Sequence, residues 1–375
     1  MPEIQTESRK AFSELVSLLQ EVDARWASPE WNLQGEADVV SAHRALMHML
    51  EGGLAGMFEC DATAPDFRRI VSPSRKFTGD NADAIYFDTP VSSDYSYRVR
   101  GQMNGAVYVS LTVEMGTENG ALGTQTAGVI NDEDFDIDGA GNFEIRFGGS
   151  PQARNWLPLA PGVSRITTRH YFEETRCAAA NPERVPRLEI EILDGPGAPP
   201  TASDPSVAAG IRRVAEFVRS RTLDQPPMAN TELPPFVSIV PNQFPQPTKP
   251  GNLGLAAFDA AYSMAPFLIG AEDALLVRGR WPRCRCANVS LWNRHQQTLD
   301  YANRPVSLNR VQTQTGADGA FTMVLAHRDP GVPNWLDSEG RNLGLVFWRF
   351  MLPEGEIETP SSEIVPFAEV SQRLA

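Results

Sequence analysis

Two segments carry the side chains best suited to acid–base chemistry. Arg169-His170-Tyr171 ends the first of two sequence repeats, and Trp348-Arg349 ends the second. Two guanidinium groups can hold a carboxylate or sulfate bidentately, and an imidazole or phenol can move a proton. We therefore expect Arg169 and Arg349 to bind substrate, and His170 and Tyr171 to be catalytic. The competing interpretation is that the arginines form ion pairs at strand ends.

A second polar cluster follows Trp292 and contains His295, Asp300, Tyr301 and Arg304. It has no counterpart earlier in the chain. Residues that depart from a repeat are the better functional candidates, because the fold itself accounts for those that recur. We expect His295, Asp300 and Tyr301 to be catalytic, and Arg304 and Trp292 to bind substrate, in a cleft between two repeats. A structural role is the alternative.

The sequence favours no protein-bound metal. The acidic segment 132–138 has carboxylates on alternate residues, like the first half of an EF-hand loop, but the acid expected at position twelve is Glu144 at position eleven. A solvated acidic turn is the favoured interpretation. The histidines lack paired spacing, and Cys284-x-Cys286 has no second cysteine pair.

Cofactor and nucleophile motifs are also missing. The sequence contains no Gly-x-Ser-x-Gly, no Ser-x-x-Lys and no Gly-rich phosphate loop between a strand and a helix. We therefore expect no cofactor and no covalent catalysis.

The composition of the chain limits the classes of partner that it can bind. The 375 residues carry a formal net charge of −14 without an offsetting basic cluster, which argues against nucleic acid and against an anionic membrane surface. No stretch approaches 18 consecutive apolar residues, and the first ten lack the apolar core of an export signal. Four cysteines are few for this length. We expect a cytoplasmic protein.

The chain opens with two amphipathic helical patterns. Phe12, Leu15, Val16, Leu19, Val22 and Trp26 share one helical face, and a similar stripe runs from Val39 to Leu54. These helices should cover a sheet or form a homodimer surface. A third helix is expected near 205–223, with Asp204 as its N-cap, and a Pro-rich extended connector follows it.

Between these helices the period changes to two. In the segment 106–115, apolar residues alternate with Tyr108, Ser110, Thr112 and Glu114. Such a strand buries one face, while the other is wet or lines a cleft.

An internal repeat is the strongest signal in the chain. Four blocks recur in order at an offset of about 176 to 180 residues. They are Asp83-Ala84-Ile85-Tyr86 with Asp259-Ala260-Ala261-Tyr262, Val99-Arg100-Gly101 with Val277-Arg278-Gly279, Val109-Ser110-Leu111 with Val289-Ser290-Leu291, and Asn155-Trp156-Leu157 with Asn334-Trp335-Leu336. The repeated Trp is either a sugar-stacking platform or, as we favour, a plug at the end of the β unit.

These patterns predict a mainly β fold built from an internally duplicated pair of antiparallel β-sandwich or jelly-roll-like units. The expected parts are an N-terminal helical segment (1–64), a first repeat (65–200), a connecting helix and Pro-rich linker (201–250) and a second repeat (251–375). A cleft between the repeats is the expected ligand site.

The second repeat resembles a known bacterial family. The stretches AEDALLVRGRWPRCRCANVSLWNRHQQTLDYANRPVSLNRVQ and DGAFTMVLAHRDPGVPNWLDSEGRNLGLVFWRFM resemble the family called domain of unknown function 1214. DNADAIYFDTPVSSDYSYRVRG and NWLPLAPGVSRITTRHYFEE resemble the front half of such proteins. The resemblance spans roughly residues 65–370 and implies a β-sandwich architecture. It implies no reaction and no catalytic residues, because none is assigned to the family.

Three functional classes follow. The leading hypothesis is a cofactor-independent enzyme that acts by acid–base hydrolysis or elimination on a small glycoside-like, carboxylated or sulfated substrate. The second is a non-catalytic module that binds a small molecule. The third is an interaction protein whose N-terminal helices drive dimerisation.

Overall fold

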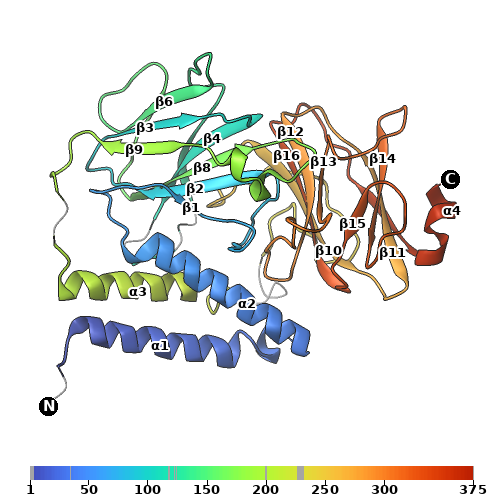
Figure 1. Ribbon diagram of the computed structural model, residues 1–375, viewed down its shortest axis with the longest axis horizontal. Helices are drawn as coiled ribbons and strands as arrows, with labels where there is room; N and C mark the ends of the chain where they lie inside the picture. The colour runs from blue at the N-terminus through green and yellow to red at the C-terminus, as the bar shows by residue number, and fades with distance from the viewer. Residues whose placement is uncertain are drawn as a thin grey trace.

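The computed structural model describes residues 4–33, 35–116, 119–121, 123, 125–198, 201–225 and 232–374. Within these residues the protein is mainly β, with four sheets and a layer of helices against the first half (Figure 1). No helix in this part of the chain is long and apolar enough to span a membrane.

Three long helices form that layer. They are α1 (Glu7–Arg25), α2 (Glu36–Gly53) and α3 (Asp204–Arg221). Their shared core includes Leu18 and Val22 of α1, Leu46 of α2 and Phe217 of α3. The expected stripe on α1 is only partly correct, because Phe12 remains 59% exposed while the buried face is centred on Leu15 and Val22.

The start of α3 also differs from the expectation. The N-cap is Ser203, which forms a capping box with Ser206. Asp204 instead reaches α1, where its carboxylate accepts hydrogen bonds from the backbone N–H groups of Glu7 (2.8 Å) and Ser8 (2.9 Å). A carboxylate at the N-terminus of a helix satisfies free N–H groups there. Asp204 therefore joins α3 to α1.

The first half of the β region contains two sheets. One has the order β1 (Arg68–Arg69), β2 (Ala84–Pro90), β8 (Val163–Tyr171), β4 (Tyr108–Met115), β5 (Thr126–Asn131). The other has the order β7 (Trp156–Leu157), β6 (Asn142–Phe147), β3 (Tyr97–Gln102), β9 (Leu188–Ile192). Their facing sides share a core that includes Val99, Leu111, Ile145 and Ile166.

The second half repeats this order of strands. One sheet runs β10 (Ala260–Leu268), β16 (Leu343–Met351), β12 (Cys286–Trp292), β13 (Ser307–Asn309). The other runs β15 (Trp335–Asp337), β14 (Ala320–Ala326), β11 (Asp273–Arg280), β17 (Ser361–Pro366), and a short helix α4 (Val370–Leu374) follows. Thus β10, β16, β12 and β13 take the places of β2, β8, β4 and β5. A core with Leu275, Val289, Met323 and Trp348 joins the two sheets.

The two halves meet face to face. The sheet containing β2, β8 and β4 packs on the sheet containing β10, β16 and β12 through a core of buried aromatic and apolar side chains. Tyr86, Tyr108 and Tyr171 come from the first half, and Tyr262 and Phe347 from the second. We call this contact the seam.

The polar side of β4 lies in this buried region. Tyr108, Ser110, Thr112 and Glu114 are all buried. The alternation read from the sequence is therefore correct, but the polar face is covered rather than wet. Neighbouring strands and the second half provide its partners, such as the Thr126 hydroxyl, which donates to Glu114 at 2.8 Å.

The Pro-rich connector is extended, as expected, and is held against β10. Val237 forms a bridge with Met264 and Thr248 forms one with Tyr262. The part of the connector at 226–231 lies outside the described residues. The connector thus pairs along the outer side of β10, whose other neighbour is β16.

Candidate functional site

Two aspartates cross the seam in opposite directions. Asp83 lies just before β2 and accepts hydrogen bonds from Asn288 Nδ2 of β12 (2.9 Å) and Asn309 Nδ2 of β13 (3.2 Å). Asp259 lies just before β10 and accepts hydrogen bonds from the Tyr108 hydroxyl of β4 and, at 3.1 Å, from Asn131 Nδ2 of β5. Each half therefore places an aspartate against the corresponding two strands of the other half.

A small cavity opens beside the first of these aspartates. We call it the seam cavity. Its volume is about 10 Å³, which is room for about one water molecule. Its walls come from both halves. They are Asn81, Asp83, Tyr171, Phe172, Cys286, Ala287, Asn288, Arg349 and Met351.

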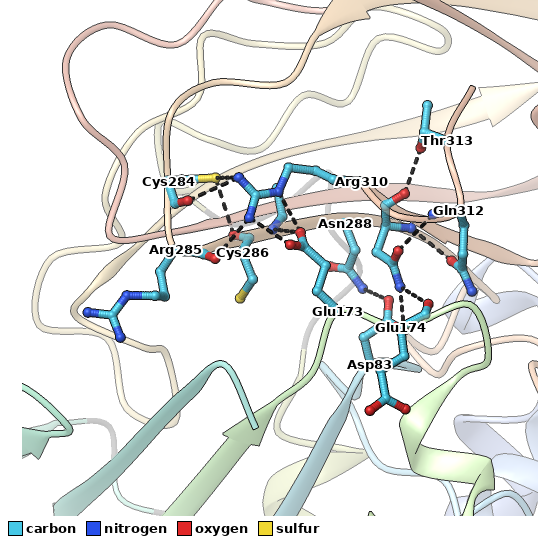
Figure 2. Close-up of polar contacts among 12 residues, drawn as sticks. Asp83, Glu173, Glu174, Cys284, Arg285, Cys286, Asn288, Arg310, Gln312 and Thr313 are labelled. Carbon is cyan, nitrogen blue, oxygen red and sulfur yellow. Dashed lines mark hydrogen bonds and ion pairs between the residues drawn. The ribbon is translucent and has the colours of Figure 1, made fainter. Parts of the chain in front are cut away.

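Asp83 is the titratable carboxyl group of this cavity. Only 2% of its surface is exposed. Burial raises the pKa of Asp83 to about 7, against the opposing effects of the Asn288 and Asn309 amides and the more distant Arg349 charge. Figure 2 shows Asp83 beside Asn288, with Glu173 and Arg310 adjoining. A carboxyl group of this kind can carry a proton at neutral pH.

Arg349 supplies the cation. It lies on β16, is 4% exposed, and donates from Nη2 to the Gly79 carbonyl oxygen at 3.2 Å. Its guanidinium carbon lies 4.8 Å from the centre of the Phe347 ring and 5.7 Å from that of Tyr262. Nε and Nη1 are buried and have no acceptor in hydrogen-bonding geometry among the described residues. A buried guanidinium with free donors is suited to an anionic group.

A second network adjoins the cavity and clamps the two halves together. Arg310 donates from Nε and Nη2 to the two carboxylate oxygens of Glu173, both at 2.6 Å. It also donates to the carbonyl oxygens of Cys284 (3.0 Å) and Arg285 (2.9 Å), as Figure 2 shows. Every polar atom of this pair has a protein partner of opposite kind. The network therefore holds the seam rather than a ligand.

The cysteines of this region are not thiolates. Burial raises the pKa of Cys284 to about 11 and raises that of Cys286 well above its ordinary value. Metal ligation needs the deprotonated sulfur. No group of three or more His, Cys, Asp or Glu side chains converges among the described residues.

The acidic segment 132–138 forms a hydrogen-bonded turn. Asp138 Oδ1 accepts from the backbone N–H groups of Ala140 (2.9 Å) and Asn142 (2.8 Å). Asp136 pairs with Arg154 at 2.9 Å. These partners explain the carboxylates without an ion.

Arg169 and Arg349 lie in the same buried region, as the sequence suggested, and both charges act on Tyr86, Tyr171 and Tyr262. Arg169 also has protein partners. Its guanidinium is 3.5 Å from Glu114 and donates to Thr112 Oγ1 and to the Leu255 carbonyl oxygen (3.0 Å). That the two arginines hold one substrate stays a prediction.

His170 is also misplaced by the sequence interpretation. Successive residues of a strand point to opposite faces, so His170 faces the core between the two sheets of the first half, where its ring lies 6.5 Å from that of Phe143. Tyr171 faces the seam cavity. Burial lowers the pKa of His170 to about 4, against the opposing effect of the Gln102 backbone. His170 is thus a neutral core residue at neutral pH.

The second predicted cluster is dispersed. His295 packs against Trp26, the residue that follows α1, with ring centres 4.8 Å apart, and burial lowers the pKa of His295 to about 4. Trp292 is buried in the seam, where it stacks on Phe347 at 4.2 Å and donates from Nε1 to the Asp80 carbonyl oxygen at 3.0 Å. Neither side chain lines the seam cavity.

The other three members lie near the edge of the seam. Lys76 Nζ lies 3.4 Å from the centre of the Tyr301 ring. Arg304 forms an ion pair with Asp337 at 2.7 Å. Asp300 accepts hydrogen bonds from Asn303 Nδ2. Tyr301 and Arg304 also line an open groove of about 690 Å³ between residues 175–182 and 301–312, to which His295 and Asp300 do not contribute. The expected shared cleft for the whole cluster is not formed.

Sequence reasoning missed Asp83, Asn288 and Asn309. One signal was available, because Asp83 begins the repeated block Asp83-Ala84-Ile85-Tyr86. An acid that precedes a buried strand in both repeats has a position fixed by the fold. Its partners could not be read from the sequence, since they lie more than 200 residues away in the other half.

Fold and site together define a mainly β protein with a buried polar site between two halves of equal strand order. A crystal structure of an uncharacterised protein from Burkholderia cenocepacia is similar, with a TM-score of 0.82 and 23% identity over 96% of this chain and 97% of that chain. At this identity the similarity shows the fold alone.

More distant similarity adds little. A crystal structure of a protein from Vibrio parahaemolyticus has a TM-score of 0.48 and 13% identity over 86% of this chain and 98% of that one. No known family model and no curated protein matches the sequence.

Proposed function

We propose that this protein is a cofactor-independent enzyme that acts by acid–base chemistry on a small anionic substrate at the seam cavity. One observation carries the proposal. Asp83 and Arg349 line the same cavity, and Nε and Nη1 of Arg349 have no acceptor in hydrogen-bonding geometry among the described residues. A proton donor and an anion-binding group thus face one small space.

The chemistry assigns different roles to the two residues. Arg349 holds a carboxylate or sulfate group of the substrate. A bound anion disfavours a second negative charge nearby, so it raises the pKa of Asp83 further above about 7. Asp83 then stays protonated and donates its proton to the leaving group, as a general acid in hydrolysis or elimination. Asn288 and Asn309 orient the carboxyl group.

The proposed site lies between two halves that we take to be related. We propose that the halves are copies of one β-sandwich or jelly-roll-like unit, as the resemblance to domain of unknown function 1214 implies. The equal strand order supports this. Duplication gives two equivalent aspartate positions, and only Asp83 lines the seam cavity. We also propose a cytoplasmic location, which the four unpaired cysteines support.

The test begins with ligands. Purified protein is screened by thermal shift against carboxylated and sulfated small molecules and glycosides, because a ligand of the native state raises its Tm. Hits are then assayed for turnover across pH. We expect kcat/KM to fall as pH rises past about 7, because Asp83 loses its proton. Asp83→Asn should lower kcat about 10²- to 10⁴-fold and abolish this limb of the profile.

Two further variants complete the test. Arg349→Lys keeps the charge but loses the planar fork, and should raise KM for the anionic substrate. The control is Asp132→Asn, since Asp132 is a buried carboxylate of the same seam that pairs with Arg285 at 3.0 Å and does not line the cavity. Loss of activity in Asp132→Asn equal to that in Asp83→Asn would show that only the integrity of the seam was measured.

A non-catalytic binding module is the second candidate, because the unpartnered nitrogens of Arg349 suit a bound anion whether or not a reaction follows. In that case hits bind, Asp83→Asn changes affinity, and no substrate turns over. The interaction protein is the third candidate. Phe12 on α1 and Val40 and Met47 on α2 are exposed, and they are the residues through which we would expect a homodimer to form.

A further inference from the structure

A second cavity lies between the helical layer and the first half. We call it the α2 cavity. It has a volume of about 40 Å³, which is room for roughly three water molecules. His48 of α2, Arg69 of β1, Lys76 and Thr167 of β8 line it, and none of them lines the seam cavity. Thr167 and Tyr171 point to the same side of β8, about 13 Å apart along the strand.

The α2 cavity has an excess of positive charge. Five of its lining residues are basic at neutral pH, and Asp88 is the one lining carboxylate. The Asp88 carboxylate forms an ion pair with Arg165, with Nη1 2.5 Å from Oδ2. Arg68 and Arg69, by contrast, form no ion pair with any described residue, and donate only to backbone carbonyl oxygens. A partly buried cation without a counter-ion is costly, so this surface favours an anion.

Hydrogen-bonding capacity is also unused at this cavity. Thr167 Oγ1 and His48 Nε2 are buried and have no partner among the described residues. Thr167 is only 3% exposed, and Lys76 is 2% exposed. Buried polar atoms are normally satisfied by protein or by a bound molecule. Two such atoms at one cavity indicate a site for a polar ligand.

The remaining wall is apolar. Phe77 and Phe217 lie on one side, with Ile70 and Leu255 nearby. A fully hydrated inorganic ion gains nothing from such a wall, whereas a short hydrocarbon chain loses its contact with water there. The combination of cationic and apolar walls selects an organic acid over phosphate or sulfate.

We propose that the α2 cavity binds the carboxylate group of a small aliphatic acid. The Arg68 guanidinium, which the strand register places on the same face as Thr167, and the Thr167 hydroxyl hold the carboxylate oxygens. Lys76 contributes charge, and Phe77 and Phe217 contact the chain. This site is separate from the seam cavity and does not depend on the proposed enzyme function.

The experiment is isothermal titration calorimetry of the full chain with sodium propionate, with sodium chloride at equal ionic strength as the blank. Thr167→Val removes the hydroxyl, and should weaken propionate binding at least about tenfold, because a hydrogen bond to a charged group is lost. Thr167 Oγ1 has no protein partner, so the variant should keep its Tm. Arg68→Met should abolish binding.

Thr168→Val is the matched control. Thr168 is the next residue on β8, is fully buried, and also has an unpartnered hydroxyl, but it points to the opposite face of the sheet. The affinity of the Thr168→Val variant for propionate should equal that of the unchanged protein. Equal weakening by Thr167→Val and Thr168→Val would overturn the proposal, as would the absence of propionate binding.

Two more outcomes separate this site from others. Sodium phosphate and sodium sulfate are titrated in parallel, and tighter binding of either than of propionate would overturn the assignment to organic acids. Asp83→Asn should leave propionate binding unchanged. Loss of binding in Asp83→Asn would place the ligand in the seam cavity and overturn the proposal, whatever the fate of the enzyme hypothesis.

Discussion

At the scale of single residues, the two seam aspartates acquire different surroundings from the same position in each half. Asp83 accepts from two amides and borders a cavity, whereas Asp259 accepts from the Tyr108 hydroxyl and from Asn131. Asp83 therefore borders a cavity, whereas Asp259 has the Tyr108 phenol as a direct partner. Different residues on the partner strands thus give the two aspartates different neighbours.

His170 provides a test of how burial acts on stability. Its pKa of about 4 in the folded protein lies below its ordinary value of 6.5. The unfolded chain therefore binds more protons between pH 6.5 and 4, and the folded protein loses stability as pH falls through this window, by up to about 3 kcal/mol. His170→Leu should remove this part of the acid sensitivity, as measured by urea unfolding at pH 7 and pH 5.

His43 should show the opposite pH dependence of stability. Its hydrogen bond with Asp23, at 2.8 Å, raises the pKa of His43. The stability that this pair contributes is present at low pH and is lost as pH rises through the raised value. His43→Gln should therefore lower stability at pH 5 more than at pH 7. An unchanged acid sensitivity in His170→Leu would contradict the assignment of His170 as a neutral core residue.

At the scale of elements, the repeated motifs are explained by packing. Val99-Arg100-Gly101 and Val277-Arg278-Gly279 each end on a glycine opposite a phenylalanine, Gly101 opposite Phe143 and Gly279 opposite Phe321. A Cβ atom at Gly101 would lie 2.4 Å from the Phe143 ring, but one at Gly279 would lie 3.1 Å from that of Phe321. The ring occupies the space that a side chain would take.

This difference predicts unequal tolerance to alanine. Gly101→Ala should lower the free energy of unfolding by about 1–3 kcal/mol, because the Phe143 ring and the neighbouring Leu188 must move. Gly279→Ala should cost clearly less. Urea unfolding midpoints of the two variants measure the difference. Equal losses would mean that the first sheet can adjust more easily than its contacts indicate.

The asparagine of the Asn-Trp-Leu motif has a structural role. Asn155 and Asn334 both have a positive φ, 54° and 59°. Asn tolerates this left-handed conformation better than most residues. Their side-chain amides donate to the backbone carbonyl oxygens of Glu144 (2.9 Å) and Thr322 (3.0 Å). The motif therefore fixes a turn in each half.

At the scale of the whole molecule, the seam makes the halves depend on each other. The seam core draws on both halves, and charged pairs such as Glu173–Arg310 and Asp132–Arg285 cross it. Separating the halves would expose the apolar core and leave these charges without partners. Both effects oppose independent unfolding.

We therefore expect a single unfolding transition for the full chain. Tryptophan fluorescence weights the second half, which contains Trp281, Trp292, Trp335 and Trp348, whereas circular dichroism follows both halves. The two urea unfolding curves should coincide. Two separate transitions, with fluorescence changing apart from circular dichroism, would show that the halves unfold independently.

The sequence by itself determined the local features of this protein. Period-two alternation identified β4, the helical stripes identified α1, α2 and α3, and the recurring blocks mark places where the same turn or glycine is needed twice. Alternation also fixes which residues of β8 can act together. Arg169 and Tyr171 point to one face of β8, so His170 could not join them.

Only the tertiary structure decided which polar groups meet. Asp83 contacts Asn288 and Asn309 because two sheets pack face to face, and Thr167 lines one cavity with His48 because a helical layer covers that side of β8. Such contacts join residues far apart in the chain, and no local pattern encodes the approach of one sheet to another. Burial at those contacts then sets the charge and hydrogen-bonding capacity on which both proposed sites depend.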